Sequence, residues 1–446
     1  MSGTADKKGS RNPSSGAGGW TRPFGIVLSL RVAAAGFAFA ATALIGRVLG
    51  DSLLGRLGLL LAIVDVAAGV VGPALDATLV RFASQKITPE HDESLPYFQR
   101  MFRVKIAVAI GLVVCGTLVG HPLLTYVIPP SDGAGIEFGG MVLAFVGAAL
   151  VTLQGFAQAY YQAHLRMAQY ALIEFANATL RLVLVACTLA VVTQPSASFL
   201  LSVYVASSAL VILGGYSRLP HAVFRKCPDE KISLREPMGF AGWVAVAAVC
   251  TSLAHRVDVI ILGVVGFTGS MIGQYVAAFT MARLGDLGIV TLFSILLPRA
   301  SSLDSAASFR RFLNRFLPLS VVVLLGGAPV YFAARWAVPL VFGPDFSGAG
   351  VLCGILFIGV LVSFGAAPGG AALYGMGQSG YVAALEGLKL ACIAGIGVFA
   401  ARHYGVLGMA WTVAAVRATI GIGTHLCAYH AAKKVGERSG YMRDRF

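Results

Sequence analysis

Charged residues are scarce in this sequence of 446 residues: Asp, Glu, Lys and Arg together make up 12% of it. A soluble globular domain carries about twice that fraction, so the composition excludes an ordinary soluble fold. Hydrophobic residues instead make up 57% of the chain, and its mean hydropathy is +0.79. Apolar runs long enough to cross a bilayer as helices recur from Phe24 onward.

Motifs of soluble enzyme chemistry are lacking as well. The seven cysteines show no CxxC spacing, and six lie within apolar runs, which is typical of small core residues rather than metal ligands. The sequence contains no Walker loop and no nucleophile elbow, so we expect no enzyme, no metal and no bound cofactor. The first 20 residues are polar, with no apolar core, and are expected to form a disordered tail rather than a signal peptide.

The apolar runs predict an all-α polytopic membrane protein. Lipid cannot hydrogen-bond open backbone groups, and continuous apolarity rather than ten-residue alternation indicates helices instead of a barrel. About twelve helices are expected, at 24–48, 56–79, 104–124, 138–161, 169–192, 198–217, 238–263, 271–297, 314–337, 348–372, 382–401 and 406–429. Near Val265 and Gly380 the gaps are so short that the spans on either side could be one.

Basic residues give the orientation of these helices. Of the 34 lysines and arginines, 24 fall on one side of the predicted topology and only four on the other. The first side includes both tails and the segments Arg81–Lys105, Arg218–Arg235 and Arg299–Arg315. Because cytoplasmic loops carry the excess of Lys and Arg, both termini are expected in the cytoplasm. The net charge of +14 is therefore a topology signal, and its scatter over short segments argues against binding of nucleic acid.

The sequence contains an internal repeat whose offset is close to half its length. Similar stretches follow one another in the same order in both halves. The corresponding residues are Gly55 and Gly273, Asp65 and Asp286, and Glu174 and Glu386, at offsets of 218, 221 and 212. Such a repeat is typical of transporters built from two related halves.

The repeat predicts two lobes of six helices each. Six is an even number, so both halves start on the same side of the membrane, and the pseudo-two-fold axis that relates them runs along the membrane normal. A cleft between the lobes can then open to each side in turn. We expect a tail at 1–23, an N-lobe at 24–225, a C-lobe at 226–430 and a basic cytoplasmic tail at 431–446.

Charged side chains recur inside the predicted spans. A charge at the bilayer centre costs about 2.5–3.5 kcal/mol on insertion scales, so each needs a partner or a hydrated cavity. The cations are Arg31, Arg181, Arg256, Arg283, Lys389 and Arg417, and the anions are Asp65, Asp76, Glu174, Asp258, Asp286 and Glu386. Their equal numbers fit structural ion pairs, whereas their concentration on some of the spans fits the lining of a hydrated cavity between the lobes.

Helical spacing indicates which of these charges can meet. The candidate pairs are Arg283–Asp286, Glu386–Lys389 and Glu174–Arg181, and His255 shares a face with Asp258. We expect Arg283 and Asp286 to face the cavity and to pair with each other in at least one state. In such a cavity the cations are candidates to hold an anionic substrate, and the acids are candidates to bind a coupling ion, H⁺ or Na⁺.

Four stretches resemble one family of transporters. The run from Ile45 to Ser84 is similar to the first helical hairpin of the Wzx-type bacterial polysaccharide flippases. These are the O-antigen and exopolysaccharide translocases of the multidrug/oligosaccharidyl-lipid/polysaccharide exporter superfamily. The stretches that begin at Leu234, Val341 and Tyr404 resemble the start of their second lobe, their ninth-to-tenth turn and their twelfth helix.

The resemblance implies a transporter that moves an oligosaccharide on undecaprenyl diphosphate from the cytoplasmic to the periplasmic leaflet. It also implies a place in the bacterial inner membrane, a role in lipopolysaccharide O-antigen or exopolysaccharide synthesis, and pathway partners, namely glycosyltransferases and a polysaccharide polymerase. A diphosphate carries about two negative charges, and guanidinium groups bind it bidentately. Arg31, Arg181 and Arg283 are therefore the candidate ligands of the diphosphate.

Two other classes stay open. A multidrug or small-molecule antiporter of the same superfamily should have an anionic cavity if it takes organic cations, whereas the charges here are balanced. The other class is an integral glycosyltransferase or a non-transporting component of glycan assembly. A glycosyltransferase is expected to have a large loop with catalytic acids outside the membrane, but the longest loops have about 25 residues.

The basic-residue count makes a prediction about orientation. A reporter enzyme that is active only outside the cytoplasm should be inactive when fused after Phe446 or within 218–237, and active when fused within 125–137. Reporter activity is measured against the amount of each fusion on an immunoblot. The opposite pattern would reverse the orientation, and with it the direction of transport.

Overall fold

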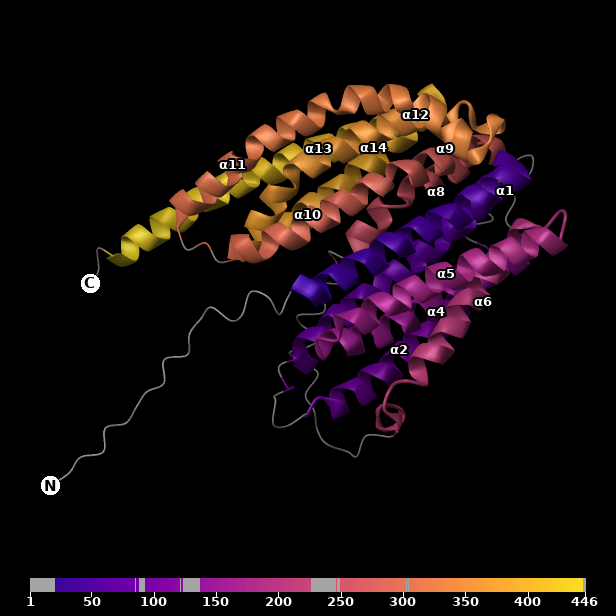
Figure 1. The fold of residues 1–446 in the computed structure, drawn as a ribbon, viewed down its shortest axis with the longest axis horizontal. Helices are drawn as coiled ribbons and strands as arrows, with labels where there is room; N and C mark the ends of the chain where they lie inside the picture. Colours follow the sequence, from indigo (N-terminus) through magenta and orange to yellow (C-terminus); the bar gives the residue numbers. More distant parts are fainter. Residues whose placement is uncertain are drawn as a thin grey trace.

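A computed structural model gives the structure of the chain (Figure 1). It describes residues 21–443 apart from 85, 88–92, 121, 123–136, 226–245, 247–248, 302 and 304. The elements that it describes are all helices, and they form eight helical stretches that are long and apolar enough to cross a membrane. The chain is therefore a helical multi-pass membrane protein, as the sequence predicts. Most of the predicted tail at 1–23 and the residues after Arg443 lie outside the described residues.

The N-lobe starts with the 64-residue helix α1 (Thr21–Ser84), which contains two crossings. The helix is broken at Gly50, where φ is 81°, a left-handed conformation that favours glycine. Phe39 precedes Gly50 and Leu61 follows it, yet both line the same cavity. The chain therefore folds back at Gly50, and the two halves of α1 run antiparallel. The other described elements of this lobe are α2 (Leu95–Cys115), η2 (Gly116–Gly120), α4 (Phe138–Ala163), α5 (Met167–Val191), α6 (Ala197–Tyr216) and η3 (His221–Phe224).

The C-lobe ends with a second broken helix, α14 (Ser379–Arg443), which turns at Gly405, where φ is 65°. Much of the predicted tail at 431–446 is helical, because α14 continues to Arg443. The predicted span 238–263 is described only in part, from a few residues before α8 onward. The other elements are α8 (Val257–Val265), α9 (Gly269–Ala282), α10 (Leu284–Ser301), α11 (Ala306–Leu325), α12 (Gly327–Phe342), η4 (Pro344–Phe346) and α13 (Ala349–Gly375).

The predicted gaps near Val265 and Gly380 are true helix boundaries. Between α8 and α9 the chain turns at Gly266, with a φ of 91°, and Thr268 caps α9 by accepting a hydrogen bond from the Met271 amide. Between α13 and α14 it turns at Gly377, with a φ of 71°. The predicted span 271–297 corresponds to one candidate crossing, Gly269–Leu297, in which only Arg283 separates α9 from α10 and keeps a right-handed helical conformation (φ −61°, ψ −20°).

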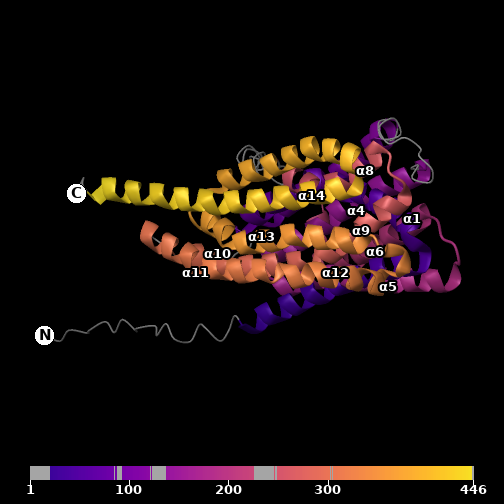
Figure 2. The same ribbon diagram turned by 90° about the horizontal axis from the view of Figure 1, so that it is seen from above.

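The two lobes lie side by side as separate layers (Figure 1). The start of α1 and the end of α14 lie at the same end of the bundle, which we call the terminal end (Figure 2). The opposite end, which holds Gly50 and the start of α9, is called the distal end. In Figure 1 the layers are close together at the distal end and farther apart toward the terminal end.

The buried apolar side chains follow the same division. The largest cluster joins the lobes, since it contains Leu57 and Leu59 of α1 together with Tyr275 and Val276 of α9. Nearer the terminal end each lobe has a cluster of its own. One of these surrounds Phe98 in the N-lobe, and another contains residues of α11, α13 and α14 in the C-lobe. Hydrophobic burial therefore holds the lobes together mainly in the distal half.

Glycines bring the two lobes into backbone contact at the distal end. A Cβ atom built on Gly55 would overlap the carbonyl oxygen of Gly269, and one built on Gly273 would overlap the carbonyl oxygen of Asp51. Ser270 donates a hydrogen bond to Asp51 beside this contact. Gly55 and Gly273 are counterparts in the sequence repeat. A contact between counterparts is expected where the axis that relates two halves passes between them.

This contact predicts that Gly273→Leu separates the lobes at the distal end. The axes of packed helices lie about 8–10 Å apart, and the contacting side chains decide where in this range of about 2 Å a pair falls. A leucine at position 273 is therefore expected to move the lobes apart by about 2 Å or more. Spin labels at Val191 of α5 and Trp336 of α12, which are 83% and 81% exposed, can report the distance by pulsed electron resonance once native cysteines are replaced.

Gly395→Leu in α14 is the matched control, because no atom lies within 4 Å of a Cβ built there. It should leave the distance between the labels unchanged. If Gly273→Leu also left that distance unchanged in a folded protein, the glycine contact would not hold the lobes together.

Candidate functional site

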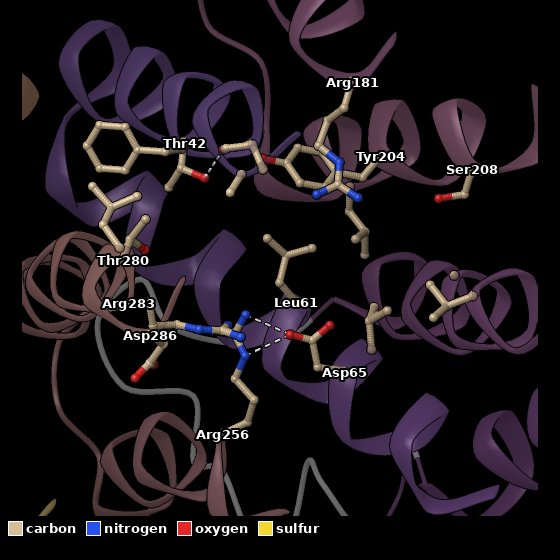
Figure 3. A pocket seen from close by; sticks show the side chains of 18 of the residues that line it. Thr42, Leu61, Asp65, Arg181, Tyr204, Ser208, Arg256, Thr280, Arg283 and Asp286 are labelled. Atoms are coloured by element: carbon tan, nitrogen blue, oxygen red, sulfur yellow. Dashed lines mark hydrogen bonds and ion pairs between the residues drawn. The ribbon is translucent and has the colours of Figure 1, made fainter. Parts of the chain in front are cut away.

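Two adjoining cavities lie between the lobes, with volumes of about 450 Å³ and about 410 Å³. Both are lined by Asp65, Val151, Arg256 and Arg283, so we treat them as one inter-lobe cavity. The N-lobe wall comes from α1, α4, α5 and α6. The C-lobe wall comes from α9, α10 and the residues just before α8. Figure 3 shows the larger part, with Arg181 and Tyr204 across the pocket from Arg283.

Arg181 of α5 is the cation of the N-lobe wall. Its guanidinium carbon lies 4.5 Å from the centroid of the Tyr204 ring on α6, a cation–π contact. Its Nε atom is buried and has no hydrogen-bond partner among the described residues. Arg181 therefore has an aromatic support that holds its side chain but no carboxylate that neutralises its charge.

Arg283 faces it from the C-lobe wall, between the end of α9 and the start of α10. Its guanidinium carbon lies 5.6 Å from the Phe279 ring centroid, one turn earlier in α9. After Arg283, α10 packs closely on α13, because a Cβ atom on Gly285 would lie 2.7 Å from a methyl carbon of Val360. The sequence LGDLG after Arg283 thus lets α10 approach α13 while the arginine lines the cavity.

Two ion pairs neutralise the other charges at this level of the cavity. Arg256 donates to Asp65 across the lobes, with Nε and Nη2 at 2.7 Å and 2.6 Å from one carboxylate oxygen. The helical conformation is interrupted at Arg256, where φ is −140°, just before α8. Within the C-lobe, Arg417 of α14 donates to Asp286 of α10 at 2.5 Å.

The charges at this level of the cavity do not cancel, because two arginines have no carboxylate partner in the described part of the chain. Both carboxylates at this level, Asp65 and Asp286, have an arginine partner. Among the described residues no ion pair is formed by Arg181 or Arg283. An unpaired charge within a membrane protein requires water or a ligand. The cavity is therefore suited to an anion that reaches both walls.

Two of the predicted pairs are wrong in this conformation. Asp286 of α10 binds Arg417, a partner on another helix, α14, rather than Arg283. Glu174 binds Arg31 of α1 at 3.4 Å rather than Arg181. Two helical turns separate Glu174 from Arg181 by about 10 Å along the axis, which is too far for direct contact.

The remaining predicted site residues have other surroundings. Lys389 and Glu386 form the predicted pair at 2.5 Å, but neither lines the inter-lobe cavity. Asp258, predicted as an ion-coupling group, is 1% exposed and does not line it either. It accepts a hydrogen bond of 2.6 Å from the Tyr275 hydroxyl and so links α8 to α9. His255 does line the cavity, on the C-lobe side.

Sequence reasoning missed Lys105. We counted it with the basic residues of a cytoplasmic loop, but its side chain is fully buried within α2. It donates hydrogen bonds to Asp76 of α1 and, at 2.8 Å, to the carbonyl oxygen of Thr152 in α4. The available signal was Asp76 itself, an intramembrane acid with no cation on the same face of its own helix.

The charged residues do not form a metal site in the described part of the chain, where no three His, Cys, Asp or Glu residues are placed to share an ion. The six cysteines that the structure describes are free. The cations that line the cavity are instead the arginines Arg181, Arg256 and Arg283, and guanidinium groups bind carboxylates and phosphates.

Comparisons with known proteins concern the fold. No protein-family profile and no curated protein matches the sequence. A structure described as the inward-facing conformation of a multidrug resistance MATE family transporter of the MOP superfamily has a TM-score of 0.66 at 13% identity, over 92% of this chain and 95% of that one. Lipid II flippase MurJ, in an inward closed conformation, has a TM-score of 0.65 at 9% identity, over 95% and 91%.

A third similar structure is a MOP superfamily transporter from Pyrococcus furiosus, for which reverse polarity of the binding pocket is said to suggest a different function. Its TM-score is 0.61 at 14% identity, over 92% of this chain and 96% of that one. At such identities the likeness shows the fold alone. The chain has the two-lobed helical fold of the MOP superfamily transporters.

Proposed function

We propose that this chain is a flippase that carries an oligosaccharide, linked to undecaprenyl diphosphate, across the bacterial inner membrane by alternating access. The observation that carries the proposal is the pair of arginines, Arg181 and Arg283, left without ion pairs on opposite walls of the inter-lobe cavity. A diphosphate brings about two negative charges and several acceptor oxygens, and guanidinium groups bind such oxygens bidentately.

The closed distal end supports a direction of loading. Backbone contacts at Gly55 and Gly273 join the lobes there, whereas toward the terminal end each lobe has a core of its own. The excess of basic residues in the sequence favours a cytoplasmic location for the terminal end. A lipid-linked substrate would then enter from the cytoplasmic leaflet, where glycosyltransferases complete it, and leave toward a polymerase on the other side.

The ion pair between Asp65 and Arg256 is the candidate coupling element. It bridges the lobes, and the Asp65 side chain is 46% exposed, so a cation can reach it from the cavity. Binding of H⁺ or Na⁺ to Asp65 would free Arg256 and weaken one of the links between the lobes. A ligand with different affinities for two states shifts their populations by that difference.

A multidrug antiporter is the alternative that the MATE-like fold favours. An organic cation would be repelled by the two arginines that no carboxylate neutralises in the described cavity. The cation excess therefore favours an anionic substrate, and a polyprenyl diphosphate is the anion that also explains a site within the membrane.

We predict that Arg283→Ala reduces transport at least 10-fold without lowering the amount of protein in the membrane. Loss of a hydrogen-bonded charge costs about 1.5–3 kcal/mol of binding, and no ion pair is broken to destabilise the fold. Arg283→Lys should recover only part of the activity, because an ammonium lacks the planar fork of a guanidinium. Transport is measured in proteoliposomes as lectin access to a short lipid-linked oligosaccharide.

The ion pair between Asp286 and Arg417 gives the structural counterpart of this test. Either single change, Asp286→Leu or Arg417→Leu, should lower the protein level, because breaking a buried pair costs about 3–5 kcal/mol. The double change to leucine should restore the level. If Arg283→Ala lowered the protein level in the same way and kept activity per molecule, Arg283 would be structural and the proposed binding role would fail.

A further inference from the structure

A third cavity, of about 290 Å³, lies on the N-lobe between α5 and α6. Leu172, Ile173 and Ala176 of α5 line one side of it, and Leu210 and Gly214 of α6 line the other. It shares no lining residue with the inter-lobe cavity, to which α5 contributes Arg181. We call it the α5–α6 groove. It is separate from the site proposed for the transported substrate.

The α5–α6 groove faces lipid rather than another helix. Only 17% of the apolar window of α5 is buried inside the protein. Leu172 is 39% exposed and Leu210 is 51% exposed, on helices long and apolar enough to cross a bilayer. In the hydrocarbon region such side chains contact acyl chains.

Two glycines of α6, Gly214 and Gly215, leave a hollow on this surface because they have no side chains. No atom lies within 4 Å of a Cβ built on Gly214 or on Gly215. The space between the two helices is therefore open to an external chain, and a larger residue at either glycine would fill it without displacing protein atoms.

One end of the groove is polar and cationic. Arg218 follows the two glycines, just beyond the end of α6, and Gln169 and Tyr161 complete this end. No ion pair involves Arg218 among the residues that the structure describes. An arginine at the end of an apolar groove, close to a helix end, complements a lipid phosphate at the membrane surface.

We propose that the α5–α6 groove binds an anionic phospholipid of the leaflet at the terminal end, with one acyl chain along Gly214 and Gly215 and the phosphate on Arg218. The bound lipid braces α5 from outside, and α5 is the helix that carries Arg181 and Glu174 on its other sides. This inference goes beyond the proposed function, because it concerns a lipid that stays bound and is not moved.

The test measures lipid binding to the purified full-length protein by native mass spectrometry. The wild type should retain one phosphatidylglycerol in preference to phosphatidylcholine. Arg218→Gln should weaken phosphatidylglycerol binding about 10-fold, since a charge-assisted hydrogen bond is lost, and should leave phosphatidylcholine binding unchanged. Gly214→Leu should weaken binding of both lipids, because it fills the groove.

The controls keep charge and size matched. Arg225→Gln removes an exposed arginine that does not line the groove, and Gly395→Leu adds a leucine to a lipid-facing glycine of the C-lobe. Both should bind as the wild type does. Arg283→Ala should also bind phosphatidylglycerol normally, so that failure of the proposed function and failure of this site can be told apart.

Two results would overturn the proposal. Equal losses in the control variants would mean that the lipid belongs to a general annulus. Displacement of phosphatidylglycerol by undecaprenyl phosphate, abolished by Gly214→Leu, would mean that the groove holds the tail of a polyprenyl carrier instead.

Discussion

A charged side chain in a bilayer must have a partner of opposite charge or contact with water, and the interior of this protein is organised by that constraint. Asp76 forms an ion pair with the fully buried Lys105 of α2, and Asp286 forms one with Arg417 of α14. Each of these pairs connects two helices at a point where neither could place its charge alone. The same constraint identifies the exceptions, since Arg181 and Arg283 have aromatic neighbours but no carboxylate. Along the described inter-lobe cavity, Asp65 and Asp286 have arginine partners, and two other arginines are left where the lobes face each other.

The closed end of the molecule depends on a different interaction, the backbone contact between α1 and α9. Helices approach this closely only where glycine replaces a side chain. Gly55 and Gly273 allow the contact, and the shared apolar cluster around Tyr275 extends it. Apolar packing and backbone contact thus hold the closed end, and the ion pair between Asp65 and Arg256 links the lobes within the cavity.

The general architecture could be read from the sequence because it follows from properties that are nearly continuous along the chain. Apolar runs of about 20 residues give the spans, and the even number in each half gives a parallel repeat. The predicted gaps near Val265 and Gly380 are also helix boundaries in the structure, where each contains a glycine with positive φ. The pairing of charges was not predictable in the same way. Spacing along one helix can suggest only partners on that helix, and it succeeded only for Glu386 with Lys389.

The failures have a common cause, which is that most partners come from other helices. The partners of Lys105 depend on how α2 packs against α1 and α4. In the sequence alone, Lys105 looks like one more basic residue of a cytoplasmic loop. The partner of Asp286 could not be found by spacing along the chain either, because Arg417 lies on α14.

The meeting of Gly55 with Gly273 bears on how such a molecule can be assembled. In a dimer of two identical half-length chains, one glycine would face its own copy across the symmetry axis, and a single position would determine the fit of both surfaces. In one continuous chain the two positions are independent. One can change while the other stays fixed, so the two lobes are free to become unequal while the closure between them is kept. The unequal distribution of charge, with Arg417 in one lobe and Lys105 in the other, is an asymmetry that only the joined form can encode.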